Sequence, residues 1–199
     1  MARQTTPATQ RRRRADAERS VASILTAALE ALASDPDASM AEIARRAGVV
    51  RATIYVHFPT RESLLDAVME QAVAEVAEAT SDAEPQRGEP KEALERVLRA
   101  TWQKLGKFHA LLAINTSRLS AKELRRRQLP VTTQLAPLIE RGQKEGVFRS
   151  DLPVSWHLAI LRAIVHAASS ESQSGRIAEA EVETAMLTTA IAAVAERKG

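Results

Sequence analysis

The sequence of 199 residues predicts an all-α fold. Apolar side chains recur three and four residues apart along most of the chain, which is the period of an amphipathic helix. Aromatic residues make up only 3% and the composition is rich in alanine, so there is little strand character. Because 45% of the residues are hydrophobic, the chain can bury a proper core. We therefore expect one large or two small domains built from helices, without strands.

The composition also excludes several classes of protein. There is no cysteine, which rules out a disulfide scaffold, a thiolate zinc site, an iron–sulfur cluster and cysteine catalysis. The longest uncharged stretches, such as Ala185–Ala195, are much shorter than the about 20 residues that span a bilayer. No charged-then-apolar leader is visible, so we expect a cytoplasmic location.

The net charge of +3 is unevenly distributed. Residues 1–61 hold ten basic and six acidic side chains, whereas residues 62–199 hold eighteen basic and nineteen acidic ones. The positive excess therefore lies in the first third of the chain. It predicts an N-terminal module that binds a polyanion, attached to a nearly neutral body.

The chain begins with an expected arm and a first helix. Residues 1–14 are polar and end in the run Arg11–Arg14, which predicts a flexible basic arm. Apolar residues from Val21 to Leu32 then form one stripe at helical spacing. The helix is expected to end at Ser34–Asp37, where proline is flanked by aspartates.

Three more helices are expected before residue 80. Ser39 and Glu42 have the spacing of a capping box, which predicts a short helix that ends at Gly48. A second short helix is expected over Val50–Val56. Thr60 follows a proline and is the expected N-cap of a longer helix that starts at Arg61.

The rest of the chain is expected to form a helical body. Ser81–Pro90 contains two prolines and a glycine, which predicts a linker or a domain boundary. Apolar residues from Leu94 to Leu105 again have helical spacing. Further helices are expected at about 107–115, 120–145, 154–170 and 178–196.

Residues 39–61 contain the one pattern that carries a function. A helix-turn-helix needs two short helices that cross steeply at a tight turn. Ile43 and Ile54 supply the apolar faces that hold two such helices together, and Ala44 is small where the second helix approaches. Gly48 makes the turn and Val49 fills the space beneath it.

The outward face of the second helix is suited to DNA. Its side chains are short or form hydrogen bonds, as contacts in a major groove require; they are Arg51, Ala52, Thr53 and Tyr55. Around them lie three side chains that can donate to phosphate oxygens: His57, Thr60 and Arg61. The N-terminus of the helix after Thr60 adds backbone N–H groups and a positive dipole end.

This segment resembles the DNA-binding domain of the TetR family of transcriptional regulators. The resemblance covers about residues 15–70 and lies in Ala47-Gly48-Val49, Thr53-Ile54-Tyr55-Val56-His57-Phe58, Arg61 and Leu64-Leu65-Asp66-Ala67-Val68. A looser match over Leu138–Arg149 is similar to a helix end in many members. At one position the chain departs from the pattern: members usually carry serine or threonine at Val50, where it caps the helix and contacts phosphate. Valine can do neither.

The resemblance implies a domain division and a set of DNA contacts. The expected parts are an arm over 1–14, a helix-turn-helix domain over 15–60, and a regulatory and dimerisation domain over 61–199. Members use side chains equivalent to Thr53, Tyr55, His57 and Arg61 on the backbone or nearby bases, and those at Arg51 and Ala52 over the bases. The full expected set is Ser39, Met40, Val50, Arg51, Ala52, Thr53, Tyr55, His57, Thr60 and Arg61. The arginine run is either a solvated tail or lies along DNA.

The resemblance also implies a small-molecule pocket and a dimer interface in the body. The residues expected at the pocket are Trp102, Phe108, His109, Leu112, Trp156, His157 and Arg162, although any one of them taken alone is more often ordinary core. In the family the last two helices pair with their copies. The residues expected there are Leu158, Leu161, Val165, Met186, Ile191 and Val194.

We therefore expect a ligand-responsive homodimeric repressor that binds a palindromic operator. The alternative is a helical adaptor or sensor of the same fold that binds a protein partner, which the basic balance of residues 1–61 disfavours. No cofactor or metal is expected, because His157 and His166 are nine residues apart and fall on opposite sides of a helix. No nucleophile elbow or phosphate-binding loop is present, so an enzyme is not expected.

Overall fold

The computed structural model describes residues 7–108 and 119–196. Over these residues the backbone is helical, apart from loops and one isolated antiparallel bridge between Phe148 and Ala195. The predicted all-α fold is confirmed. None of the described helices is long and apolar enough to cross a membrane. Most of the helix expected at 107–115 lies outside the described residues.

The chain forms two compact units, residues 1–69 and 70–199, and the boundary falls inside helix α4 (Arg61–Asp82). The sequence predicted the boundary at residue 60, where a proline separates two helices. The first turns of α4 nevertheless bury Leu64, Leu65 and Val68, and these residues belong to the first unit. A helix continues through the boundary, so the expected division at 60 is corrected to the middle of α4.

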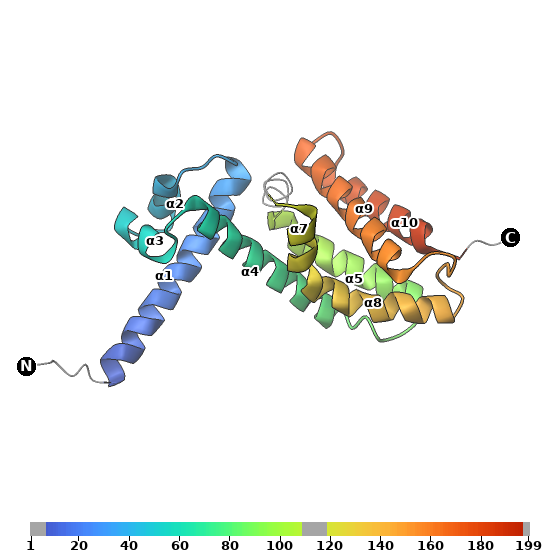
Figure 1. The fold of residues 1–199 in the computed structure, drawn as a ribbon. Coiled ribbons are helices and arrows are strands. Elements are labelled where there is room, and N and C mark those ends of the chain that lie inside the picture. The colour runs from blue at the N-terminus through green and yellow to red at the C-terminus, as the bar shows by residue number, and fades with distance from the viewer. Residues whose placement is uncertain (1–6, 109–118, 197–199) are drawn as a thin grey trace, which may run out of the picture. The chain divides into compact units, whose positions relative to one another are not determined.

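The first unit also contains α1 (Pro7–Ser34), α2 (Met40–Arg46) and α3 (Arg51–His57). Figure 1 shows α2 and α3 beside the C-terminal half of α1, where the buried residues begin at Ile24. The expected arm is corrected over residues 7–14, which form the first turns of α1. Arginine favours helices and proline is tolerated in a first turn, so the sequence after Pro7 does not oppose helix formation.

The second unit contains α5 (Pro90–Leu105), the 3₁₀ turn η1 (Gly106–Phe108), α7 (Ala121–Arg127), α8 (Leu129–Lys144), α9 (Val154–Ser174) and α10 (Glu179–Val194). Helices α9 and α10 run side by side, α10 also packs on α5, and α8 packs on both α5 and α9 (Figure 1). Their shared core includes Leu94, Leu138 and Phe148. The helical region expected at 120–145, with a break at Pro130, forms α7 and α8; Pro130 in the first turn of α8 lacks the N–H that a continuous helix needs.

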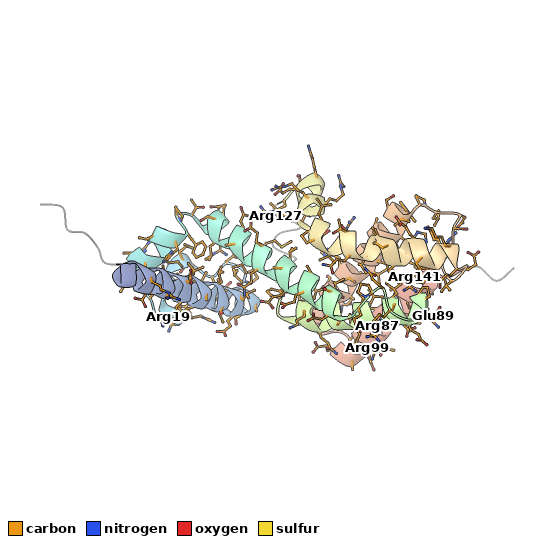
Figure 2. The ribbon with its side chains drawn as sticks, turned by 90° about the horizontal axis from the view of Figure 1, so that it is seen from below. Arg19, Arg87, Glu89, Arg99, Arg127 and Arg141 are labelled. Carbon is orange, nitrogen blue, oxygen red and sulfur yellow. The ribbon has the colours of Figure 1, made fainter. Side chains whose placement is uncertain are left out.

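The loop between α4 and α5 is held by two arginines of the second unit. Arg96 of α5 donates to three of its backbone carbonyls at 2.9–3.0 Å. Arg141 of α8 donates to two more, at 2.7 and 3.2 Å (Figure 2). The accepting carbonyls belong to Ala83, Glu84, Pro85, Arg87 and Gly88. The segment predicted as a linker or a domain boundary is therefore an ordered loop of the second unit.

The end of α8 depends on Gly142. Its carbonyl accepts from the backbone N–H of Val147 at 2.9 Å and of Phe148 at 3.0 Å, so the chain turns back over the helix. A Cβ added to Gly142 would lie 2.8 Å from Cγ of Phe148, and closer still to other ring atoms. This close approach gives a physical reason for the helix-end pattern noted over Leu138–Arg149.

Candidate nucleic-acid interface

Helix α2 begins with the predicted serine cap. The hydroxyl of Ser39 accepts from the backbone N–H of Glu42 at 3.2 Å. The carboxylate of Glu42 accepts from Arg45 at 2.7 and 2.9 Å and from Arg46 at 2.8 Å. The hydrogen bonds from Arg45, then those from Arg46, lower the pKa of Glu42 to about 2. The serine half of the capping box is confirmed. The Glu42 carboxylate accepts from Arg45 and Arg46 instead of from the backbone N–H of Ser39.

The same arrangement starts α7. Ser120 caps the N–H of Glu123 at 3.2 Å, and the Glu123 carboxylate accepts from Arg126 and Arg127. These hydrogen bonds also lower the pKa of Glu123 to about 2. Both helices have only seven residues. A helix that short is marginal by its own hydrogen bonds, so a cap and a forked ion pair contribute to its formation.

The turn after α2 is built as the sequence predicts. Gly48 has a φ of +68°, in the left-handed region that glycine adopts without strain. Its N–H donates to the carbonyl of Arg45 at 3.2 Å, and the N–H of Val49 donates to that of Ala44 at 3.0 Å. This pair of bonds is a Schellman ending, which sends the chain into α3 at a steep angle. Ser23 of α1 donates to the carbonyl of Ala47 at 2.9 Å and holds the turn on the first helix.

Helix α3 has one buried and one exposed face. Ile54 is fully buried, while Arg51, Ala52 and Tyr55 are exposed as predicted. The Arg51 guanidinium lies 5.6 Å from the centre of the Tyr55 ring, a cation–π distance. The predicted contacts Thr53 and His57 are half-buried at the sides of the helix. The exposed face of α3 therefore combines one cation, one hydroxyl-bearing ring and short side chains.

Two valines complete this surface. Val50, the N-cap of α3, makes no side-chain cap bond and is 70% exposed. Val56 is 77% exposed and is absent from the predicted set of DNA contacts. The signal was available: Val56 is two residues from the buried Ile54, about 200° around a helix, and so had to face outward.

The start of α4 carries a reciprocal cap. The N–H of Ser63 donates to the Thr60 hydroxyl oxygen at 3.1 Å, and the N–H of Thr60 donates to that of Ser63 at 3.2 Å. Thr60 is thus the N-cap that the sequence predicts. This exchange leaves the backbone amides of Arg61 and Glu62 facing the end of the helix.

Arg61 is bound within its own unit. Its guanidinium donates to the carbonyl of Ala38, and also to that of Pro36 at 2.6 Å. Both carbonyls belong to the segment that leads into α2. The side chain predicted to reach phosphate thus connects the first turn of α4 to the start of α2.

Met40 must be removed from the set of predicted DNA contacts. Its side chain is 8% exposed and packs into the first unit, because the first residue of α2 points toward the core. Its neighbour Ser39 is exposed and acts as the cap.

The residues predicted to line a pocket separate into three groups. Trp102, Phe108 and His157 are buried, and Arg162 is half-buried. Trp156 is 52% exposed, which corrects its assignment to an interior pocket, since neighbouring positions on α9 face opposite ways. His109 and Leu112 lie outside the described residues. His157 Nδ1 lies 3.1 Å from the carbonyl of Pro153, whereas its buried Nε2 has no hydrogen-bond partner among the described residues.

The residues predicted at the dimer interface are also divided. Leu161, Met186 and Val194 are buried in the core of the chain itself, which corrects their assignment to a subunit interface. Leu158, Val165 and Ile191 are half-buried at the edge of that core.

Together, the all-α fold and the exposed second helix of a helix-turn-helix define a DNA-binding transcriptional regulator. The family model described as "Bacterial regulatory proteins, tetR family" matches residues 24–68, and the model "Tetracyclin repressor-like, C-terminal domain" matches residues 90–195. The chain belongs to the TetR family.

Individual relatives agree with this membership. The HTH-type transcriptional repressor LfrR of Mycolicibacterium smegmatis is 28% identical over 158 residues, which cover 79% of this chain and 82% of LfrR. The crystal structure of LfrR in complex with proflavine has a TM-score of 0.71 at 22% identity and covers 90% of this chain and 99% of that one. FadR of Bacillus subtilis in complex with stearoyl-CoA has a TM-score of 0.70 at 20% identity, with 86% and 98% covered.

Proposed function

We propose that the protein is a homodimeric repressor that binds a palindromic operator in the cytoplasm and releases it when a small molecule binds. The observation that carries the DNA-binding part is the exposed face of α3, which presents Arg51, Ala52 and Tyr55 to solvent. One seven-residue helix reads few base pairs. Two copies related by a two-fold axis read two half-sites about 34–36 Å apart.

The outer faces of α9 and α10 support dimerisation. Exposed residues in the middle of both helices are small and uncharged; they are Ala163, Ala167, Ser170, Thr184, Ala185, Thr188, Thr189 and Ala192. Small side chains let helices approach closely, and the absence of charge removes the cost of desolvating ions at an interface. The half-buried Leu158, Val165 and Ile191 lie on the same two helices and would add apolar area.

DNA binding is tested by fluorescence anisotropy of the full chain on its own upstream DNA, against scrambled competitor, in a salt series. We expect specific binding with a log–log salt slope between roughly −5 and −9, because a dimer neutralises several phosphates. Equal, weak binding to both DNAs, followed by failure of a random-pool selection to enrich any site, would favour the adaptor of the same fold.

Dimerisation is tested by charge placed on the outer faces. We expect Ala163→Glu and Ala192→Glu to sediment as monomers with unchanged helical content, since both positions are exposed in the single chain. Gln103→Glu, exposed on α5, is the matched control and should remain dimeric. If all three variants sediment alike, the interface lies elsewhere.

The small-molecule part of the proposal is supported by the relatives and by His157. LfrR and FadR have been crystallised with proflavine and with stearoyl-CoA, respectively. A buried polar atom without a protein partner, such as Nε2 of His157, is usually satisfied by a ligand or a water. A thermal-shift screen that includes proflavine and stearoyl-CoA should yield compounds that raise the melting temperature of the protein. These compounds should lower its DNA affinity in the anisotropy assay. If His157→Phe binds those compounds as well as the wild type does, His157 is not a ligand contact.

A further inference from the structure

The most exposed positions of α3 are apolar. Val56 is 77% exposed, and Ala52, one turn earlier on the same side, is exposed as well. Both lie opposite Ile54, which is fully buried. The centre of the outward face therefore has no hydrogen-bonding group, whereas Arg51 and Tyr55 lie to one side of it.

Exposed apolar side chains of this size are concentrated on this helix. Over residues 7–69, the large hydrophobic side chains that are exposed are Val50, Tyr55 and Val56, all in α3 or at its N-cap. Isolated exposed hydrophobics are common on protein surfaces, but Val56 and Ala52 lie four residues apart on one side of α3 and together form a small apolar patch.

The net positive charge of residues 1–61 indicates which kind of molecule binds this patch. Residues 1–61 carry ten basic and six acidic side chains, and Arg51 lies directly beside the patch. The positive excess attracts a polyanion. To fill the patch, this polyanion must also present an apolar group that α3 can reach. In the major groove of DNA that group is the C5-methyl of thymine.

We propose that Val56, together with Ala52, packs against the C5-methyl group of a thymine in each half-site of the operator. This inference rests on the proposed function, since it requires α3 to lie in the major groove. Val56 is then a specificity-determining residue that selects thymine by apolar contact, with no hydrogen bond to the base.

Replacing thymine by deoxyuridine tests the contact directly, because the replacement removes the methyl group and keeps every hydrogen-bonding atom of the base pair. The probe is a duplex recovered by selection from a random pool with the full-length protein. We expect deoxyuridine at one thymine per half-site to weaken wild-type binding about fourfold, the equivalent of about 0.8 kcal/mol for one buried methyl-sized group. Val56→Ala should bind the thymine duplex less tightly and should not respond to deoxyuridine at that position.

Two controls separate this contact from general effects. Deoxyuridine in the flanking DNA should leave affinity unchanged, and Val56→Ala should melt no lower than the wild type because the side chain is exposed. Specific binding without deoxyuridine sensitivity, or sensitivity that persists in Val56→Ala, overturns the inference and leaves the proposed function intact. Failure of the selection to recover any specific duplex overturns both.

Discussion

Replacing Arg61 by alanine removes a connection between two helices of the first unit. The guanidinium donates to the carbonyls of Ala38 and Pro36, and a methyl group can replace neither bond. Hydrogen bonds from a charged donor contribute about 1.5–3 kcal/mol each when they are shielded. The bond to Pro36 is exposed, so water replaces most of its contribution, whereas the bond to Ala38 is partly buried. We therefore expect Arg61→Ala to lose about 1.5–3 kcal/mol of unfolding free energy, mainly from the lost bond to the Ala38 carbonyl.

The effect on DNA binding separates a positioning residue from a phosphate contact. If Arg61 holds the segment before α2, Arg61→Ala weakens binding to all sequences while the salt slope stays that of the wild type. A lost phosphate contact would instead reduce the slope by about 0.9 per phosphate. Urea denaturation, hydrogen exchange over Met40–Arg46 and anisotropy in a salt series measure these quantities on one preparation.

Arg19→Ala is the matched control, because Arg19 is an exposed arginine of α1 whose ion pair with Asp16 lies on the surface (Figure 2). Such a pair contributes about 0–1 kcal/mol. Arg61→Lys should recover only part of the stability, since an ammonium group cannot reproduce the planar fork. Wild-type stability of Arg61→Ala combined with a smaller salt slope would refute the positioning role and restore the predicted phosphate contact.

Three other changes have outcomes that the structure determines. Val50→Thr supplies the missing side-chain cap of α3 and should raise the unfolding free energy by about 1 kcal/mol; an unchanged urea midpoint would show that the cap cannot form. Gly142→Ala places a Cβ against the Phe148 ring and should lower stability by about 1–3 kcal/mol, whereas Gly106→Ala, with open space around it, should melt like the wild type. The Glu42 carboxyl should titrate in NMR with a pKa of about 2; because this pKa is depressed from 4.5, its stabilisation is complete above pH 4.5 and is lost as the pH falls through about 2. A midpoint near 4.5 would contradict the fork with its two arginines.

Features decided by a few neighbouring residues could be predicted from the sequence. The turn at Gly48, the serine cap of α2 and the Thr60 cap of α4 each depend on atoms within four residues, and each is present. The outward face of α3 was predicted for the same reason. Val56 lies opposite the buried Ile54 and could have been predicted to face outward, but an apolar side chain carries no hydrogen-bonding group that marks it as a DNA contact.

Features decided by distant residues could not be predicted. Leu161 and Leu158 belong to one apolar region of α9, and periodicity alone does not tell which of them α10 and α8 cover. The prolines and glycine of residues 81–90 resemble a linker, and the Arg96 and Arg141 that hold this loop lie outside it. Tertiary contacts thus reversed two interpretations that were reasonable on local grounds.

The loop between α4 and α5, held by Arg96 and Arg141, also determines whether the end of α4 can move independently of α5 and α8. A loose linker would let the end of α4 move while α5 and α8 stayed in place. Arg96 of α5 and Arg141 of α8 bind the carbonyls of the loop, so the loop connects the end of α4 rigidly to both helices. We therefore expect a displacement of α5 or α8 to be passed on to the end of α4 through these hydrogen bonds.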